Sequence, residues 1–532
     1  MSDTNTKKGI VWGGSLVGSH NPSSLGYQEP RYQKRYKLTD EALQDKQLPS
    51  SLIIQFRNKD GEELGTQMDL PTTSNCDELC TLLHSLLEEE DDKKPYAFYA
   101  RLEDGEEVEI ASDLTTLLHN YQNLISTEKV LEITYQPLAL FRVRPVTRCT
   151  DTLEGHTEAI LHVMFSPDGK QLASGGGDTT VRFWDIQTNT CKTIGRGHKN
   201  HVLCVSWSPD SRRFASGDKS GMLISWDQKL GKASPTILRN AHKKFITGIC
   251  WEPLHLNSKC ERLVTSSKDS TVRVWNVRTQ SCEITLSGHA DSVECVVWSG
   301  EGLLYSASRD RTIKVWAANL PLNQGFGKLI RTLQGHAHRV NTLALSCEYI
   351  TRTGPFHPTK YTFYTNEHDA YQHACQKYND FKGSAEHERL ISGSDDNTLI
   401  LWNPTESKQP IKRLTGHQSL VNHIAFSPDA RFFASASFDK KVKLWDGKTG
   451  QYLATFTGHV GSVYRIAWSS DSRYLCSASK DSTVKLWQIG QKNAVETLPG
   501  HYDEVYALDW SPSGRGGVAS GSKDRTVKIW KH

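Results

Sequence analysis

The chain of 532 residues carries 63 basic and 60 acidic side chains, so its formal net charge is +3. Hydrophobic residues make up 37% of it and aromatic residues 9%, which supports a large core and excludes a wholly disordered chain. No run of about 18 apolar residues is present, which excludes a membrane-spanning helix. The 12 cysteines form no CxxC pair, so we expect reduced thiols rather than a disulfide framework.

The first 138 residues differ from the rest of the chain. Residues 1–47 are polar and without periodicity, and we interpret them as a disordered leader with no secretory signal. Residues 48–138 alternate short apolar strands with turns at 58–61 and 103–105. We expect a main helix from Asp77 to Leu87, a short helix at Leu114–Leu118 and a last strand at Lys129–Tyr135. This order, ββαβ(β)αβ, predicts a small α+β domain of the ubiquitin-like β-grasp type, in which no terminal Gly-Gly for conjugation is present.

From residue 147 the sequence repeats. A Gly-His pair recurs seven times, Ala241-His242 is an eighth copy, and a tryptophan follows each, 28 residues after the histidine in four copies. Most copies are 42 to 47 residues apart, which is the length of a four-stranded propeller blade. We therefore predict an eight-bladed WD-repeat β-propeller over 147–532, preceded by a linker at 139–146. The strand at 147–153 should complete the last blade and close the ring.

Each repeat also contains Ser or Thr ten residues before its tryptophan and, in seven copies, Asp six residues before it. In the first repeat these residues are His156, Ser174, Asp178 and Trp184; the second repeat has Ser220 at the aspartate position. A buried imidazole and carboxylate must satisfy each other, so we expect one structural tetrad per blade. A His-Asp-Ser set repeated eight times is not expected to be an active site.

The fifth repeat is about 38 residues longer than the others, with the surplus at about 349–388. Residues 366–381 favour a helix, and a long insertion in a compact domain is usually functional or disordered. His368, His373 and Cys375 lie close together in it, but their spacing matches no standard zinc site.

Charge is distributed unevenly. Residues 48–138 carry 6 basic and 19 acidic side chains, a net charge of −13, which leaves +14 for residues 139–532 once the +2 of the leader is counted. The residue before the tetrad aspartate position is basic in five repeats, at Lys219, Lys268, Arg309, Lys480 and Lys523. Either these side chains are ordinary exposed turn residues, or they form a face toward RNA or ribosomal protein. No aromatic RNA-recognition motif accompanies them, so reading of base sequence is not indicated.

An acidic ubiquitin-like domain before eight WD repeats closely resembles the Notchless family. The segments that carry the resemblance are FRVRPVTR at 141–148, WEPLHL at 251–256 and VNHIAFSPD at 421–429. The resemblance covers about residues 50–532. It implies a nuclear factor, found in nucleolus and nucleoplasm, that assembles the 60S ribosomal subunit. It also implies a pre-60S anchor for the propeller near rRNA and the 5S ribonucleoprotein, and the family name adds a role in Notch signalling.

The same resemblance assigns a role to Glu128. In the family, the ubiquitin-like domain binds the metal-ion-dependent adhesion site of the AAA ATPase midasin, whose ATP-driven pulling remodels the particle and releases the factor. Glu128 matches the family's Ser-Thr-Glu segment and is the only acid between Asn123 and Glu128. A carboxylate suits the Mg²⁺ ion that the partner holds. We expect no cofactor of the chain's own.

Two other classes of protein remain open. A ubiquitin-pathway WD-repeat adaptor would also join a propeller to a ubiquitin-like fold. An enzyme is disfavoured, because the nearest phosphate-loop look-alike, 516–523, lacks the Gly-Lys-Ser/Thr order that positions phosphates.

Overall fold

Two compact units, residues 1–136 and 137–532, make up the chain, and each is described by itself. The computed structural model describes residues 50–58, 63–87, 96–102, 107–110, 114–121, 130–137, 143–227, 234–238, 241–318, 325–359, 364, 366–384, 387–491, 493–514 and 517–532. The leader predicted at 1–47 lies outside these residues, as does part of the linker predicted at 139–146. No helix in the described ranges is long and apolar enough to cross a membrane.

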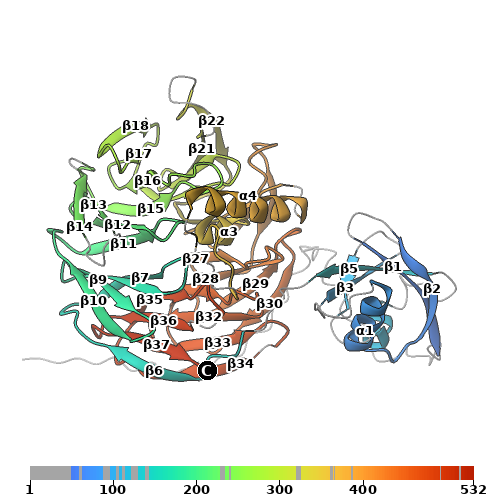
Figure 1. Ribbon diagram of the computed structural model, residues 1–532. Helices are drawn as coiled ribbons and strands as arrows, with labels where there is room; N and C mark the ends of the chain where they lie inside the picture. Colours follow the sequence, from blue (N-terminus) through green and yellow to red (C-terminus); the bar gives the residue numbers. More distant parts are fainter. Residues whose placement is uncertain are drawn as a thin grey trace, which may run out of the picture. The chain divides into compact units, whose positions relative to one another are not determined.

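The N-terminal unit is a five-stranded sheet with two helices (Figure 1). Its elements are β1 (Ser51–Arg57), β2 (Glu63–Pro71), α1 (Cys76–Leu86), β3 (Tyr96–Arg101), β4 (Glu107–Glu109), α2 (Leu114–Tyr121) and β5 (Leu131–Pro137). The strand order is β2-β1-β5-β3-β4, with β1 and β5 parallel at its centre. This arrangement is the β-grasp of ubiquitin-like domains, so the predicted α+β fold is confirmed.

The core of this unit lies between the sheet and α1. Phe56, Ile133 and Leu83 are fully buried there, and they come from β1, β5 and α1. The start of α1 is fixed by the Glu78 carboxylate, which accepts a hydrogen bond of 3.3 Å from the Asn75 backbone N–H. Such a bond satisfies a donor that the first helical turn leaves free.

The C-terminal unit is an eight-bladed propeller of four-stranded antiparallel sheets, which confirms the predicted fold. The strands of each blade are given from the innermost outward: blade one, β7 (Ile160–Phe165), β8 (Gln171–Gly176), β9 (Val181–Asp185) and β10 (Thr190–Gly195); blade two, β11 (Val202–Trp207), β12 (Arg213–Asp218), β13 (Leu223–Asp227) and β14 (Ser234–Leu238); blade three, β15 (Ile246–Trp251), β16 (Arg262–Ser267), β17 (Thr271–Asn276) and β18 (Ser281–Ser287). The next three are blade four, β19 (Val293–Trp298), β20 (Leu303–Ser308), β21 (Thr312–Ala317) and β22 (Leu329–Gln334); blade five, β23 (Val340–Leu345), β24 (Leu390–Ser394), β25 (Leu399–Trp402) and β26 (Pro410–Leu414); and blade six, β27 (Val421–Phe426), β28 (Phe432–Ser437), β29 (Val442–Asp446) and β30 (Tyr452–Phe456). The last two are blade seven, β31 (Val463–Trp468), β32 (Tyr474–Ser479), β33 (Val484–Gln488) and β34 (Ala494–Leu498); and blade eight, β35 (Val505–Trp510), β36 (Val518–Ser522), β37 (Val527–Lys531) and β6 (Arg148–Leu153).

Blade eight is closed by the strand that precedes the first repeat. β6 pairs antiparallel with β37, with Leu153 opposite Val527, as predicted from the sequence. Blade eight also packs closely on blade one: a Cβ atom at Gly521 would lie 2.7 Å from the Ile160 side chain. The ring therefore closes both by strand pairing and by side-chain packing between the first and last blades.

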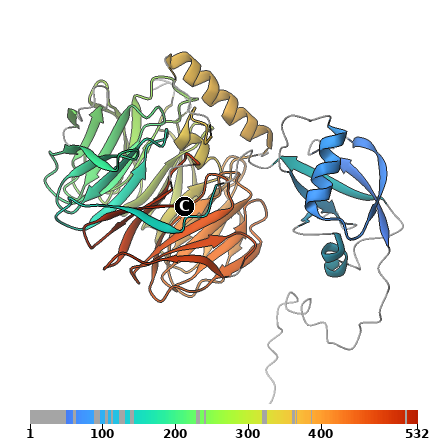
Figure 2. The same cartoon turned by 60° about the horizontal axis from the view of Figure 1, so that its bottom comes forward.

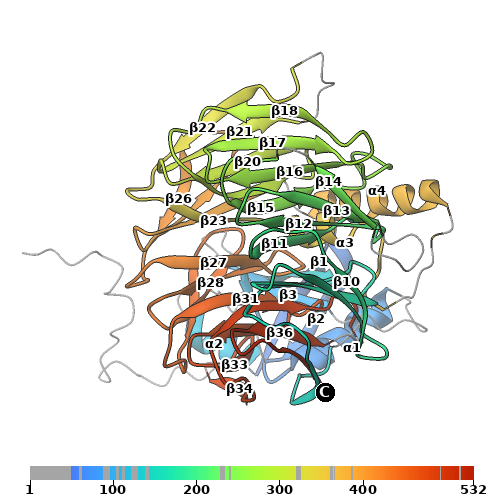
Figure 3. The same cartoon turned by 90° about the vertical axis from the view of Figure 1, so that its left-hand side faces the viewer.

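The fifth repeat's surplus forms two helices between β23 and β24. They are α3 (Glu348–Thr353) and α4 (Glu367–Ser384), and α4 confirms the helix predicted at 366–381. Connections between the first and second strands of a blade lie at the end opposite to the loops that carry the tetrad histidines, because strands of an antiparallel meander alternate in direction. Figures 2 and 3 show both helices at one end of the propeller strands.

Candidate interaction surfaces and the central channel

In blade one, the four predicted residues form one hydrogen-bonded chain. His156 Nδ1 lies 2.9 Å from Asp178 Oδ2, and His156 Nε2 lies 2.8 Å from Ser174 Oγ. Trp184 Nε1 donates to the same Oγ at 2.8 Å. Because the carboxylate only accepts and the indole only donates, a neutral imidazole with its proton on Nδ1 gives every hydrogen an acceptor. The set is thus internally satisfied.

The same arrangement recurs in all eight blades. The Trp Nε1 to Ser or Thr oxygen distances lie between 2.7 and 3.0 Å. Each hydroxyl is therefore held by the histidine and the tryptophan of its own blade. In each of the eight blades, this serine or threonine therefore has a structural role.

Blade two departs from the predicted pattern. Ser220 occupies the aspartate position of the repeat, but Asp218, two residues earlier, takes the tetrad role with its Oδ2 at 3.2 Å from His198 Nδ1. The other oxygen, Oδ1, accepts from the Ser220 hydroxyl at 2.6 Å and from the Met222 N–H at 2.8 Å. Lys219 consequently follows the tetrad aspartate rather than preceding it.

The tetrad carboxylates are stabilised in their charged form. Burial alone would raise the pKa of Asp439, but the hydrogen bond and charge interaction with His417, together with the backbone N–H groups of Gln418 and Lys441, outweigh it and lower the pKa to about 2. In Asp218 the same balance, with His198 and Ser220 as partners, lowers the pKa to about 2. These carboxylates therefore contribute to the stability of the blades.

The five candidate basic residues all lie in turns between the second and third strands of their blades, and so on the face that carries the tetrad loops. Arg309 Nε lies 3.8 Å from Asp291, and Lys523 Nζ lies 3.4 Å from Asp503. Those two positive charges are thus partly compensated. Lys480 is exposed and forms no ion pair with a described residue.

Lys219 and Lys268 meet around one aromatic ring. Their ammonium groups lie 5.4 Å and 5.0 Å from the centre of the Phe245 ring. Neither ammonium forms an ion pair with a carboxylate of the described residues, and the exposed Lys243 and Lys244 precede Phe245. We call Lys219, Lys243, Lys244, Phe245 and Lys268 the lysine cluster; it concentrates positive charge on blades two and three.

Glu128 lies outside the described residues, in the segment 122–129 that joins α2 to β5. The two elements that flank this segment belong to the core: Leu117 and Leu118 of α2 are buried, and so is Leu131 at the start of β5. Both ends of this connection are therefore fixed by packing.

The insertion crosses the end of the propeller's central channel. Arg352 of α3 donates to Asp509 of blade eight at 2.5 Å, and the Tyr349 hydroxyl donates to the Pro512 carbonyl at 3.2 Å. The Gly514 N–H donates to the Pro358 carbonyl at 3.0 Å. A segment that leaves the ring at blade five is thus bonded to blade eight.

α4 extends this contact to blades three and four. Its Tyr378 ring stacks on His255 with ring centres 4.0 Å apart, and the Lys382 ammonium lies 3.4 Å from Glu301. Half-buried Lys377 donates to Thr353 Oγ1 at 2.8 Å and so ties α4 to α3. Sequence reasoning found the helix but not these cross-blade contacts, because no local pattern marks them.

The residues considered as a zinc site are not brought together. His368 Nε2 lies 2.9 Å from Gln372 Nε2, and the Cys375 thiol donates to the His255 carbonyl at 3.8 Å. The His373 ring instead packs at 5.8 Å from Tyr364. No group of three or more metal-binding side chains occurs within the described ranges, and all 12 cysteines are free thiols.

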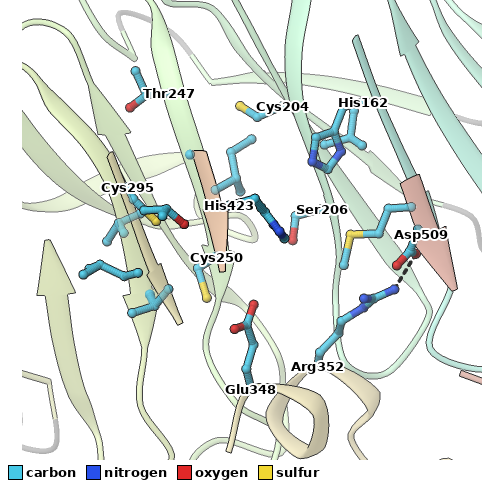
Figure 4. A pocket seen from close by; sticks show the side chains of 18 of the residues that line it. His162, Cys204, Ser206, Thr247, Cys250, Cys295, Glu348, Arg352, His423 and Asp509 are labelled. Carbon is cyan, nitrogen blue, oxygen red and sulfur yellow. Dashed lines mark hydrogen bonds and ion pairs between the residues drawn. The ribbon is translucent and has the colours of Figure 1, made fainter. Parts of the chain in front are cut away.

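Figure 4 shows the channel itself, a cavity of about 420 Å³ lined by the innermost strands of all eight blades and by α3. His162, His423, Arg465 and Asp509 line it from blades one, six, seven and eight, and Arg352 enters from α3. The wall of the channel is thus rich in titratable groups.

Comparisons with known proteins agree with this architecture. The WD domain, G-beta repeat model matches eight segments: 147–185, 189–227, 234–276, 280–317, 367–403, 408–446, 450–488 and 492–531. The NLE (NUC135) domain model matches residues 52–117. The Notchless protein homolog of Arabidopsis thaliana is 50% identical over 406 residues, which span 76% of this chain and 82% of that protein. The chain belongs to the Notchless family.

Two further relatives support this assignment. Protein Notchless of Drosophila melanogaster is 44% identical over 75% of this chain and 79% of its own length. Ribosome assembly protein 4 of Saccharomyces cerevisiae is 42% identical over 78% of this chain and 81% of its own length. Among solved structures, the computationally designed Ika8 protein matches with a TM-score of 0.55 and 25% identity, covering 72% of this chain and all of the designed chain. That last similarity concerns the propeller fold of this Notchless-family chain.

Proposed function

We propose that this chain is a non-catalytic assembly factor of the large (60S) ribosomal subunit that acts in the nucleolus and nucleoplasm. The observation that carries the proposal is its match to relatives named ribosome assembly protein 4. The Saccharomyces cerevisiae protein is 42% identical and the Chaetomium thermophilum protein 37% identical, over 78% and 76% of this chain. The two-unit architecture supports a division of labour between two docking surfaces.

In this proposal the propeller anchors the chain in the pre-60S particle, near rRNA, the 5S ribonucleoprotein and other assembly factors. The support is the lysine cluster of blades two and three. Lys219 and Lys268 share Phe245 and no carboxylate, so their charge is available to phosphates. Lysines bind a phosphate backbone without reading its sequence, which fits an anchor whose specificity comes from shape.

The ubiquitin-like unit is proposed to dock on the metal-ion-dependent adhesion site of the AAA ATPase midasin. Glu128 would supply a carboxylate oxygen to the Mg²⁺ ion held by midasin, because a hard divalent cation prefers oxygen ligands. The support is that Glu128 lies on a connection whose two ends, α2 and β5, are fixed in the core. ATP-driven pulling on this unit would then remodel the particle and release the factor.

The absence of catalysis is part of the proposal. The hydroxyls and imidazoles that would draw an enzymatic interpretation are each bonded within their own tetrad. The eight tetrad hydroxyls are also fully buried inside the blades, where a substrate has no access to them.

The experiment is affinity purification of the tagged full chain from nuclear extract, followed by mass spectrometry and sequencing of bound rRNA. We expect large-subunit precursor rRNA, 5S ribonucleoprotein components and midasin. Enrichment of ubiquitin-ligase or proteasome subunits without pre-ribosomes would contradict the proposal and favour a ubiquitin-pathway adaptor.

A further inference from the structure

The central channel contains charged and polar side chains that the tetrads and the interaction surfaces do not use. The relevant position is the third residue of each innermost strand, and it recurs at the same register in every blade. From blade one to blade eight it is occupied by His162, Cys204, Gly248, Cys295, Thr342, His423, Arg465 and Ala507.

The basic members of this set lie on one side of the ring. His423, Arg465 and His162 belong to blades six, seven and one, and blade eight between them contributes only the small Ala507. Innermost strands of successive blades are in contact, including β31 with β35 and β35 with β7. His162, His423 and Arg465 all line the channel cavity, whereas Ala507 does not.

The rings of His162 and His423 have no hydrogen-bond partner in the part of the chain that the structure describes. The Nδ1 atom of each is both buried and unpaired among these residues. Figure 4 shows both rings projecting into the channel. A buried polar atom without a partner is costly, so each such atom calls for a ligand or an ordered solvent molecule.

Arg465 shows the same deficit with a full charge. Its guanidinium lines the channel, yet it forms no hydrogen bond or ion pair with a described residue. Asp509 also lines the channel, but its carboxylate already accepts hydrogen bonds from Arg352 at 2.5 Å and from the Phe165 N–H at 2.7 Å. Arg465 is half-buried, so its guanidinium is accessible from the channel, and an arginine is a strong ligand for planar or tetrahedral oxyanions.

Two acids that line the channel, Asp509 and Glu348, attract the charge of Arg465, but burial outweighs them and lowers the pKa of Arg465. Burial raises the pKa of Glu348 on α3 and so favours its uncharged form. Glu294 of blade four accepts a hydrogen bond of 2.8 Å from Ser292. Burial first, and then the charge of Arg465, holds the pKa of His162 well below its usual range and lowers the pKa of His423 to about 3, so both imidazoles act as neutral hydrogen-bonding groups beside the Arg465 guanidinium.

We propose that the central channel is a binding site for a phosphate-type oxyanion, held by Arg465 with His162 and His423 and closed off at the insertion end by Arg352 of α3. The cavity of about 420 Å³ compares with roughly 30 Å³ for a water molecule in the liquid. It can therefore accept inorganic phosphate or a compact phosphate ester. Such an anion would bridge blades one, six and seven and would stabilise the ring.

The test uses the full chain and its thermal unfolding at fixed ionic strength in chloride, in inorganic phosphate and in myo-inositol hexakisphosphate. We expect a saturable rise in melting temperature with at least one phosphate compound, because a ligand of the folded state stabilises it. In titration calorimetry, Arg465→Gln should bind the phosphate compound at least about tenfold more weakly than the parent chain does, because it loses one charged hydrogen-bonding group. Arg309→Gln, an exposed arginine of the tetrad face, is the matched control and should bind as the parent chain does.

Comparison of the two phosphate compounds distinguishes free phosphate from a phosphate ester. Saturation by inorganic phosphate with no advantage for the hexakisphosphate identifies free phosphate, and a much tighter hexakisphosphate identifies a phosphate ester. If Arg465→Gln does not fold, His162→Gln and His423→Gln, measured singly, should each weaken binding. Equal melting temperatures in chloride and both phosphate compounds, or an undiminished shift in Arg465→Gln, would overturn the proposal.

Discussion

Arg352 and Asp509 lie 157 residues apart in the sequence and form an ion pair of 2.5 Å across the mouth of the central channel. The arginine belongs to the insertion of blade five and the aspartate to the innermost strand of blade eight. The insertion thus joins blade five to blade eight across the channel.

This contact should be measurable as a coupling energy. In a double-mutant cycle with Arg352→Ala and Asp509→Ala, we expect about 1–3 kcal/mol of coupling in the free energy of unfolding, because the pair is largely withdrawn from water. The control is Lys382 with Glu301, an ion pair of 3.4 Å in which the lysine is 56% exposed. Its coupling should be below about 0.5 kcal/mol. Equal coupling in the two cycles would contradict the role assigned to Arg352.

Blade two provides a test of which residue completes its tetrad. Asp218→Asn should cost about 2–4 kcal/mol of unfolding free energy, because it removes the charged acceptor of buried His198. Ser220→Ala, at the position where the repeat pattern places the aspartate, should cost about 1 kcal/mol or less, since it removes one hydrogen bond. Denaturant unfolding of the two variants gives the comparison, and the reverse ranking would refute the assignment of Asp218.

The regular part of the fold was predictable because it is repeated. Eight copies of the same His, Ser or Thr, Asp and Trp spacing fix the blades, and the orphan strand at 147–153 fixes the closure. In the N-terminal unit, strand and helix order alone were enough for the β-grasp. Asp218 was missed because Ser220 occupies the expected position, while a carboxylate two residues earlier reaches the same histidine.

The cross-channel contacts could not be predicted in the same way. The pairing of Arg352 with Asp509 depends on how the ring brings blades five and eight together at the channel, and neither residue stands in a motif. The channel arginine and histidines do have a signal, since they share one register in the repeats. It becomes visible only when the innermost strands are compared position by position. Glu128 lies outside the described residues, so its assignment stays a prediction.

Stability should fall at acidic pH through the tetrad carboxylates. The pKa of Asp439 is about 2 in the folded chain and about 3.9 for an unfolded aspartate. A lowered folded-state pKa contributes stability that is complete above about pH 4 and is lost as pH falls toward 2. Asp439→Asn should therefore remove about 2 kcal/mol of this pH-dependent term. Unfolding by urea between about pH 2 and pH 6 measures it, and an unchanged pH slope in the variant would contradict the prediction.

The lysine cluster should dominate particle binding by the tetrad face. Lys219→Glu combined with Lys268→Glu should weaken co-sedimentation with pre-60S particles and lower the salt dependence of rRNA binding, since each phosphate contact adds about one unit of slope. The control is Arg309→Glu with Lys523→Glu, whose charges lie beside Asp291 and Asp503. We expect the control to bind more strongly than the first variant. Wild-type co-sedimentation by Lys219→Glu/Lys268→Glu would sink the anchor assignment.

The central claim, two docking surfaces with separate partners, is tested most directly by Glu128→Ala in the full chain. The measurement is Mg²⁺-dependent capture of midasin and, in parallel, co-sedimentation with pre-60S particles. We predict loss of midasin binding with particle binding retained, and the same loss for Glu128→Asp, whose carboxylate reaches less far. Asp69→Ala, which removes an exposed acid from edge strand β2, is the control and should bind both partners. Capture of midasin by Glu128→Ala at wild-type affinity would contradict the account.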